Sequence, residues 1–469
     1  MAGVIDKLFT PKNMVAPSLV KGELPSAKQA YGKCLSIAWP SAIESVLVAL
    51  VSSVDTMMVS SLGPKAISAV GVTGQPRMLM MTAILSLNMG VTAVVARRRG
   101  EGDMLGASKT LKQSLWINLM LGAIMVAISC FLTAPIMRLA GAQAEYIADS
   151  VAYFRIIMSG QFFACIGMTI NAAQRGCGNT KVSMRSNVTA NLVNIVFNYL
   201  LINGNFGFPK LGVVGAAIAT AIGHMVAFLM ALYSVVHPHK GELNIVDGGK
   251  WGFDKKTLSS VTKVATGAFT EQISLRAGLF AFSSIIARLG TIQFATHQIS
   301  MSLSQLIFSF ADGLGVASSS LVGQGLGMKR PDLSTIYGKI GQRCSMIIGL
   351  TLSALLVVFR RQLYGLFTDD AEVIALGMRL CYFVAAVCMI QTSQVVISGC
   401  LRGAGDSRYV AVTSLVSIGT FRVGLSYLLC YPLGIGVYGA WIGFLVDQCT
   451  RLVLNYTRFH RGGWTKIEL

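Results

Sequence analysis

Charged residues are scarce in this chain. They make up 13% of its 469 residues, whereas a soluble domain carries about 25%. With 53% hydrophobic residues and a mean hydropathy of +0.62, too little polar surface is left to face water, and a soluble or disordered protein is excluded. Proline is also rare, with 11 residues beside 49 glycines, which favours close helix–helix contacts in a membrane. The composition predicts an all-α polytopic membrane protein.

Three kinds of motif are missing. The ten cysteines lie mostly inside apolar runs without a CxxC pair, so we interpret them as small buried hydrophobes and expect no disulfide and no resident metal. The first 35 residues are too polar for a signal peptide, so the first apolar segment is expected to be a retained span. The glycine-rich run 323–327 lacks the Lys-Ser/Thr of a P-loop, and no ATPase motif occurs elsewhere. We therefore expect no cofactor.

Apolar segments long enough to cross a bilayer, about 20 residues each, recur along the whole chain. We predict twelve spans, near 36–61, 71–96, 113–136, 149–173, 186–203, 211–236, 264–287, 297–322, 344–359, 377–400, 409–431 and 435–457. An even number of spans places both termini on the same side of the membrane.

The distribution of positive charge predicts which side that is. The 39 Lys and Arg exceed the 20 Asp and Glu, for a formal net charge of +19. With the N-terminus inside, 27 basic residues fall in cytoplasmic segments and 7 in outer loops, as positively charged loops tend to stay in the cytoplasm. No basic run is interleaved with aromatics, so nucleic acid is not an expected partner. We predict a multi-pass protein of the cell (inner) membrane with both termini cytoplasmic.

The sequence also repeats itself. At an offset of 227, Glu44 falls on Glu271, and the loop 175–181 falls on 402–408 with the shared pattern Arg-Gly-x-Gly-Asn/Asp-Thr/Ser. Two copies of six spans enter the membrane in the same direction and are therefore parallel repeats. The expected order is a cytoplasmic N-terminal segment (1–35), an N-lobe (36–236), a cytoplasmic linker (237–263), a C-lobe (264–457) and a cytoplasmic tail (458–469).

The first span and its exit, Pro40-Ser-Ala-Ile-Glu44 through Ser53-Val-Asp55 to Leu62-Gly63, together with the loops at 175 and 402, resemble the multidrug and toxic compound extrusion (MATE) transporters. The resemblance covers about residues 36–457. It implies a V-shaped pair of lobes and a cation-driven antiporter that expels organic, often cationic and amphipathic, compounds. The wider superfamily also contains lipid-linked oligosaccharide flippases, so the fold alone does not name the substrate.

Five acids lie inside predicted spans, and each is costly there unless it faces a cavity or a partner. They are Glu44, Asp55, Glu271, Asp312 and Asp447. The resemblance implies that Asp55 is the N-lobe site for the coupling ion, joined by Asn194 and Thr220. Where the family often has a second Asp, this chain has Asn198. One carboxylate is enough to carry a proton, whereas Na⁺ usually needs more oxygen charge, so H⁺ is favoured over Na⁺.

The second lobe offers several charged or polar candidates for its cavity: Glu271, Arg276, Asp312, Gln391, which stands where other members have an acid, and Arg422. An arginine inside the membrane, such as Arg422, needs a carboxylate partner. We predict that this partner is Asp312 or Glu271. The pair is expected either to line the cavity or only to hold the helices in place. Asp447 and Arg451, four residues apart, predict a local pair. Glu44 is predicted either to line the cavity or to reach cytoplasmic water.

The sequence thus predicts a secondary exporter working by alternating access on small organic molecules in the lipid bilayer, functional as a monomer. The alternative within the superfamily, a flippase for a lipid-linked intermediate, predicts several basic residues in the cavity to hold phosphates. The alternative of another class, a membrane-embedded enzyme, predicts a cluster of His, Cys or acids at the end of a span, and the five scattered His supply none.

Overall fold

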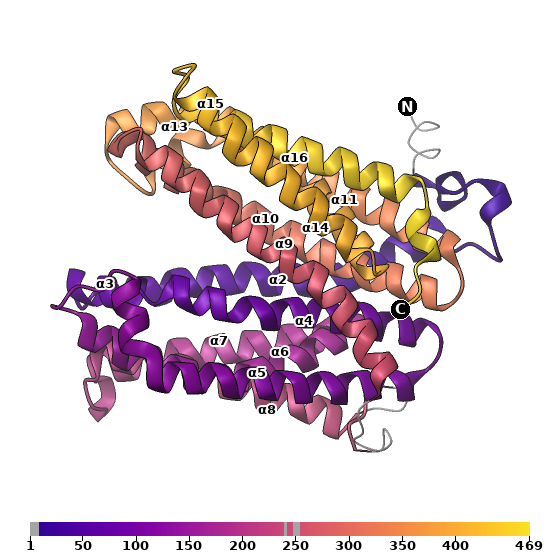
Figure 1. Cartoon of the computed structure of the whole chain (residues 1–469), viewed down its shortest axis with the longest axis horizontal. Coiled ribbons are helices and arrows are strands. Elements are labelled where there is room, and N and C mark those ends of the chain that lie inside the picture. The colour runs from indigo at the N-terminus through magenta and orange to yellow at the C-terminus, as the bar shows by residue number, and fades with distance from the viewer. Residues whose placement is uncertain (1–8, 239–241, 247–253) are drawn as a thin grey trace. The chain divides into compact units, whose positions relative to one another are not determined.

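The computed structural model describes residues 9–238, 242–246 and 254–469, and every regular element in these ranges is a helix (Figure 1). Parts of the expected N-terminal segment (1–8) and linker (239–241 and 247–253) lie outside the described residues. The chain divides into two compact units. One comprises Ile43–Thr262 and is called the N-unit; the other comprises Met1–Ala42 and Lys263–Leu469 and is called the C-unit.

The N-unit is a bundle of long helices. Its elements are the second part of α2 (Ala27–Ser60), α3 (Pro64–Gly71), α4 (Gly74–Gly100), α5 (Met104–Leu139), α6 (Ile147–Gly176), α7 (Thr180–Asn203) and α8 (Gly212–Val236). Helix α6 packs against α4, α5 and α8, and α8 also packs against α7. Small residues allow this close approach, since a Cβ on Gly160 of α6 would lie 2.6 Å from the Cα of Ala221 of α8.

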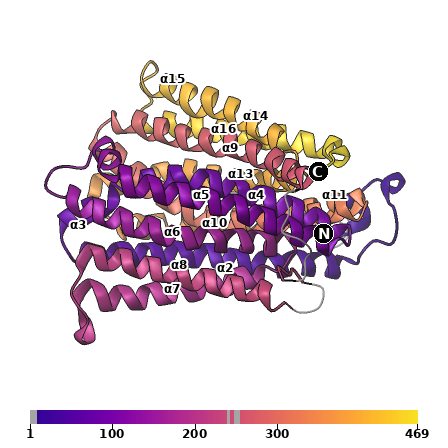
Figure 2. The same cartoon turned by 60° about the horizontal axis from the view of Figure 1, so that its bottom comes forward.

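The C-unit contains the first part of α2 and the second set of helices. These are α9 (Lys255–Ala287), α10 (Thr291–Gly327), α11 (Pro331–Val358), α12 (Arg360–Gly365), α13 (Ala371–Gly403), α14 (Ser407–Ser417), the π-helix η4 (Ile418–Leu425), α15 (Ser426–Cys430) and α16 (Val437–His460). The long helices of each unit run side by side in both views (Figures 1 and 2). Helices α2 and α9 each belong to both units, because the two boundaries fall between Ala42 and Ile43 and between Thr262 and Lys263.

Each predicted span coincides with one long helix, or with the continuous α14–η4–α15 segment. In the described part of the chain, nine helices are apolar and long enough to cross a membrane by hydropathy. The other three long helices, α7, α9 and α16, are more polar along their length, which lowers their hydropathy but not their helicity. The prediction of an all-α, polytopic membrane protein of about twelve long helices is confirmed.

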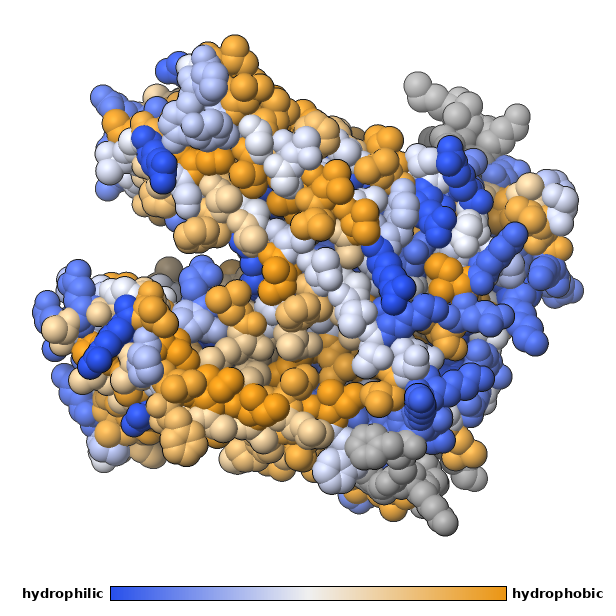
Figure 3. Space-filling view, viewed as in Figure 1, coloured by the Kyte–Doolittle hydropathy of each residue, from blue (hydrophilic) through white to orange (hydrophobic). Residues whose placement is uncertain are grey.

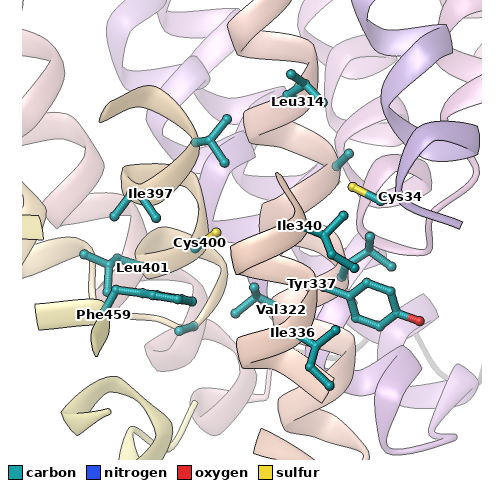
Figure 4. Close-up of a cluster of buried hydrophobic side chains, with 14 of the residues drawn as sticks. Cys34, Leu314, Val322, Ile336, Tyr337, Ile340, Ile397, Cys400, Leu401 and Phe459 are labelled. Atoms are coloured by element: carbon teal, nitrogen blue, oxygen red, sulfur yellow. The ribbon is translucent and has the colours of Figure 1, made fainter. Parts of the chain in front are cut away.

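Apolar side chains form both the interior and the outer belt. In the C-unit, one cluster joins α2, α10, α11, α13 and α16, as shown in Figure 4 around Cys34, Val322, Ile340 and Cys400. In the N-unit, hydrophobic residues cover α5, and hydrophilic residues gather beyond its two ends (Figure 3). This pattern fits helices whose middle parts face lipid.

The repeat seen in the sequence is also a repeat of the backbone. Helices α6 and α13 end in the same turn, with Gly178 and Gly405 at positive φ (83° and 93°). In both turns the next residue, Asn179 or Asp406, donates its amide to a carbonyl five positions earlier (2.9 and 2.8 Å). Only glycine adopts this left-handed conformation without strain, so the shared Gly positions specify the shared turn.

Candidate functional site

Asp55 of α2 lies at the centre of a polar cluster in the N-unit. Asn198 of α7 donates its side-chain amide to Asp55 Oδ1 at 2.7 Å. Asn194, one turn earlier on α7, presents its side chain on the same face, because residues four apart on a helix are neighbours. Both asparagines are buried, with 2% and 5% of their surface exposed. The predicted residues Asp55, Asn194 and Asn198 are therefore close together.

Thr220 of α8 completes this cluster. The Asn194 amide satisfies all its neighbours when its nitrogen faces Asp55, at 2.9 and 3.2 Å from the two carboxylate oxygens. In that orientation its oxygen accepts from the Thr220 hydroxyl at 3.2 Å and from the Thr220 backbone amide at 3.1 Å. The buried Asn198 Oδ1 accepts no hydrogen bond from any residue that the structure describes. The cluster thus has a free oxygen acceptor beside a carboxylate, which is the chemistry that a proton or small cation requires.

No basic side chain forms a salt bridge with Asp55 among the described residues. Arg77 of α4 acts on Asp55 electrostatically, but only from beyond ion-pair distance. Asp55 therefore differs from Glu44, Glu271 and Asp447, each of which pairs with an arginine at 4.0 Å or less. A carboxylate held by neutral amides is not tied to its ionised form by a fixed positive charge.

Glu44 and Glu271 make the same ion pair in the two repeats. Arg175 at the end of α6 lies 3.5 Å from Glu44, and Arg402 at the end of α13 lies 2.9 Å from Glu271. Both pairs are separated by 131 residues in sequence. Glu44 also accepts hydrogen bonds from Ser183 (3.0 Å) and Asn187 (2.6 Å).

Sequence reasoning placed Arg175 and Arg402 in cytoplasmic loops and assigned them no site role. The structure places both in the last turn of their helices. The sequence repeat could have identified both arginines, because Glu44 and Arg175 recur as Glu271 and Arg402 at the same offset of 227 residues. Glu44 is mostly buried by these contacts, with 12% of its side chain exposed.

Arg422 pairs with Asp447, and the prediction that its partner is Asp312 or Glu271 is wrong. Arg422 Nη2 and Nε donate to Asp447 Oδ2 at 2.5 and 3.0 Å. The guanidinium also lies over the ring of Phe444, 4.4 Å from its centroid. The physical reason is that Glu271 is already neutralised by Arg402, whereas Arg422 lies in the π-helix that packs against α16, the helix carrying Asp447.

Asp447 is shared between two arginines. The predicted local pair with Arg451 is present, at 3.5 Å from Arg451 Nε to Asp447 Oδ1. Arg451 also donates to Gln448 at 3.2 Å and to Ser414 at 3.4 Å. The side chains of the two arginines and Asp447 are 0–4% exposed, so this cluster holds two positive charges and one negative charge inside the C-unit.

The remaining C-lobe candidates lie on three other helices. Arg276 of α9, Asp312 of α10 and Gln391 of α13 are each partly buried. Their assignment to a cavity stays a prediction.

Two polar residues of the Asp55 cluster correspond to aromatic residues in the second repeat. At the offsets of the repeat, Asp55 corresponds to Phe282 and Thr220 to Phe444. These two rings pack with their centroids 5.4 Å apart inside an apolar cluster of the C-unit. At these two of its four positions, the second repeat therefore has aromatic rings in place of polar groups.

The described residues contain no group of three or more His, Cys, Asp or Glu placed to hold a metal ion. Polar residues on membrane-spanning helices, in a chain built from two six-helix repeats, define a multi-pass membrane protein of the type that moves solutes. The family model MatE matches residues 40–200 and 268–428, one stretch in each repeat. The chain belongs to the MatE family, whose members are transporters rather than enzymes.

Relatives and solved structures agree along nearly the whole chain. A probable multidrug resistance protein NorM of Thermotoga maritima is 26% identical over 451 residues, covering 96% of this chain and 95% of that protein. The multidrug resistance protein PmpM of Pseudomonas aeruginosa is 28% identical over 456 residues, covering 91% and 92%.

Among solved structures, an outward-facing multidrug resistance MATE transporter of the MOP superfamily has a TM-score of 0.86 at 21% identity, covering 92% of this chain and 96% of that one. A MOP superfamily transporter from Pyrococcus furiosus, described as having a binding pocket of reverse polarity that suggests a different function, has a TM-score of 0.87 at 21% identity, with coverages of 94% and 97%. These likenesses show the fold. They do not show the substrate, since one fold here carries pockets of different polarity.

Proposed function

We propose that this chain is a secondary active multidrug exporter, coupled to H⁺ rather than Na⁺ through Asp55, that expels organic cationic and amphipathic compounds by alternating access. The observation that carries the proposal is the Asp55 cluster, an intramembrane carboxylate held by the amides of Asn194 and Asn198 and without a salt bridge to any described residue. The names of the relatives NorM and PmpM support the export of drugs. The absence of an ATPase motif in the sequence is consistent with energy supplied by an ion gradient.

The donors and acceptors of the cluster favour a proton as the guest. Na⁺ needs several oxygen ligands with enough charge to offset its dehydration, and the cluster offers one carboxylate, since Asn198 stands where a second acid would be. A proton needs only one carboxylate oxygen. In this proposal, proton entry at Asp55 removes its charge, changes the hydrogen bonds to Asn194 and Asn198, and favours the state with low affinity for the drug.

The proposed setting is the inner membrane with both termini cytoplasmic, and the protein works as a monomer. A cationic drug then enters from the cytoplasm, and protons enter from outside. Export requires only that ion and drug favour opposite states, and the two need not share a site.

The test is efflux of ethidium from cells that express the wild type, Asp55→Asn or Asp55→Glu at equal levels, with and without a protonophore. We expect the wild type to expel the dye, Asp55→Asn to lose at least about 90% of the rate because an amide cannot carry a proton, and Asp55→Glu to keep part of it. The protonophore should abolish efflux. Asp369→Asn, an exposed acid outside the long helices, is the matched control and should export normally.

Three results would contradict parts of the proposal. Efflux by Asp55→Asn at the wild-type rate would remove Asp55 from coupling. Efflux that survives the protonophore and depends on sodium would make Na⁺ the coupling ion. A well-folded wild type that moves no cationic dye would favour the flippase alternative, and flipping of a lipid-linked oligosaccharide would then be measured in proteoliposomes.

A further inference from the structure

A groove runs along the surface of the N-unit between α6 and α8, apart from the Asp55 cluster. Its volume is about 390 Å³. Most of its lining is apolar, and its side walls include Ile156, Phe163, Ile218, Ile222 and Met225. Its floor is formed where Gly160 and Ala221 bring the two helices together, because a Cβ on Gly160 would lie 2.6 Å from the Ala221 Cα.

The groove lies on a face of α8 that remains exposed along the helix. Met225 is 43% exposed, and Leu229, one turn further, is 53% exposed. In a membrane protein such an exposed apolar face is covered by lipid tails. The groove is therefore a hollow in a lipid-facing surface of the N-unit.

One cation, Arg155 of α6, lies at the rim of this groove. It is exposed, and its guanidinium forms no hydrogen bond or ion pair within the described part of the chain. The nearby hydroxyl of Ser159 donates to the Arg155 backbone carbonyl at 2.9 Å. Arg155 is eight residues beyond Ile147, where α6 begins, or about 12 Å along the helix.

A guanidinium at this depth needs an anionic partner. Leaving it in hydrocarbon is costly, and its flexible stem allows the charged end to reach the headgroup region. Phosphate is the anion available there, and Arg forms bidentate hydrogen bonds with phosphate oxygens. The positive charge disfavours a cationic drug at the same place.

We propose that the α6–α8 groove is a binding site for one anionic phospholipid, whose acyl chain fills the apolar hollow and whose phosphate pairs with Arg155. Under the predicted topology, α6 begins at the outer side, so the lipid belongs to the outer leaflet. The site is independent of the Asp55 cluster, and its lining residues take no part in the proposed coupling.

Native mass spectrometry of the purified full-length chain, titrated with phosphatidylglycerol and separately with phosphatidylethanolamine, tests the proposal. We expect one tightly retained phosphatidylglycerol per chain, and weaker retention of phosphatidylethanolamine because its headgroup is neutral overall. Arg155→Gln should weaken retention about tenfold, as expected for loss of a charge-assisted hydrogen bond. Arg155→Lys should restore part of it.

Two further variants distinguish lipid binding in the groove from a general effect of positive charge on lipid retention. Ser159→Trp keeps Arg155 but fills the groove, and it should also lose the retained lipid. Arg138→Gln removes an exposed cation near the C-terminal end of α5, outside the groove, and should retain the lipid as the wild type does.

The proposal is overturned by any of four results. These are unchanged retention in Arg155→Gln, equal loss in Arg138→Gln, equal retention of the two lipids, and dimers that disappear with Ser159→Trp, which would make a second copy of the chain the occupant.

Discussion

Glu44 and Glu271 occupy equivalent positions but differ in how completely they are enclosed. The Glu271 side chain is 3% exposed and lies 2.9 Å from Arg402, whereas Glu44 is 12% exposed and lies 3.5 Å from Arg175. Removing one partner of a buried pair leaves the other charge uncompensated. The same substitution should therefore have different costs at the two positions.

We predict that Glu271→Gln lowers the free energy of unfolding by about 3 kcal/mol, and Glu44→Gln by roughly 1 kcal/mol because Ser183 and Asn187 still surround the site. Thermal unfolding of the purified protein in detergent measures both. The double variant Glu271→Gln with Arg402→Gln should recover part of the loss, since no charge is then left alone. Equal losses for the two single variants would contradict the prediction.

The Arg422–Asp447–Arg451 cluster predicts an asymmetry between acid and base. Asp447→Asn leaves two buried arginines without a carboxylate, whereas Arg422→Met leaves Asp447 paired with Arg451. We expect Asp447→Asn to lower the melting temperature clearly more than Arg422→Met, by the same unfolding measurement. A larger loss from Arg422→Met would show that Asp447 depends on Arg422 alone.

Individual side chains were predictable to different extents. The grouping of Asp55, Asn194, Asn198 and Thr220 follows from the family resemblance and agrees with the geometry. The partner of Arg422 did not follow, because intramembrane acids can be paired only when the facing helices are known. The spacing of four residues predicts the pair of Asp447 with Arg451. It does not predict the shorter contact of Asp447 with Arg422 of η4, which lies on a different helical segment.

Glycines determine how closely the helices of the C-unit approach. A Cβ on Gly403 of α13 would lie 2.2 Å from the Ser319 carbonyl oxygen of α10, and a Cβ on Gly399 would lie 2.6 Å from the Gly315 carbonyl oxygen. Backbone atoms cannot move aside as a flexible side chain can, so α10 and α13 would have to separate.

We predict that Gly403→Ala lowers the free energy of unfolding by about 2 kcal/mol, the usual cost of overpacking. The matched control is Gly32→Ala in α2, where nothing lies within 4 Å of the added Cβ. That change should be neutral or stabilising by up to about 1 kcal/mol, because Ala is the better helix former. Thermal unfolding measures both, and a stable Gly403→Ala would contradict the packing argument.

Elements were predictable in number and centre but not in length or type. Hydropathy detects the part of a helix that lies in hydrocarbon, so the predicted span 344–359 is shorter than α11, which begins at Pro331. The π-helix Ile418–Leu425 was not predicted. A π-turn holds more residues than an α-turn, so it changes the direction of Arg422 without changing the hydropathy of the segment.

At the scale of the whole molecule, the excess of basic residues in alternate loops predicts the orientation in the membrane. A C-terminal fusion to green fluorescent protein should be fluorescent, and a C-terminal fusion to alkaline phosphatase should be inactive, because both termini are expected in the cytoplasm. Alkaline phosphatase fused after residue 142, between α5 and α6, should be active. The opposite pattern of activities would reverse the topology and place Arg155 in the inner leaflet.

The Glu–Arg ion pair that occurs in both repeats indicates which features of the molecule arose first. We infer that a feature present in both copies, such as Glu44–Arg175 and Glu271–Arg402, was already present in a single six-helix ancestor from which both repeats derive. Asp55 and the Arg422 cluster occur in one copy each, so each became one-sided only afterwards, by gain in one copy or loss in the other. The difference in chemistry between the two halves is then the younger property of the molecule.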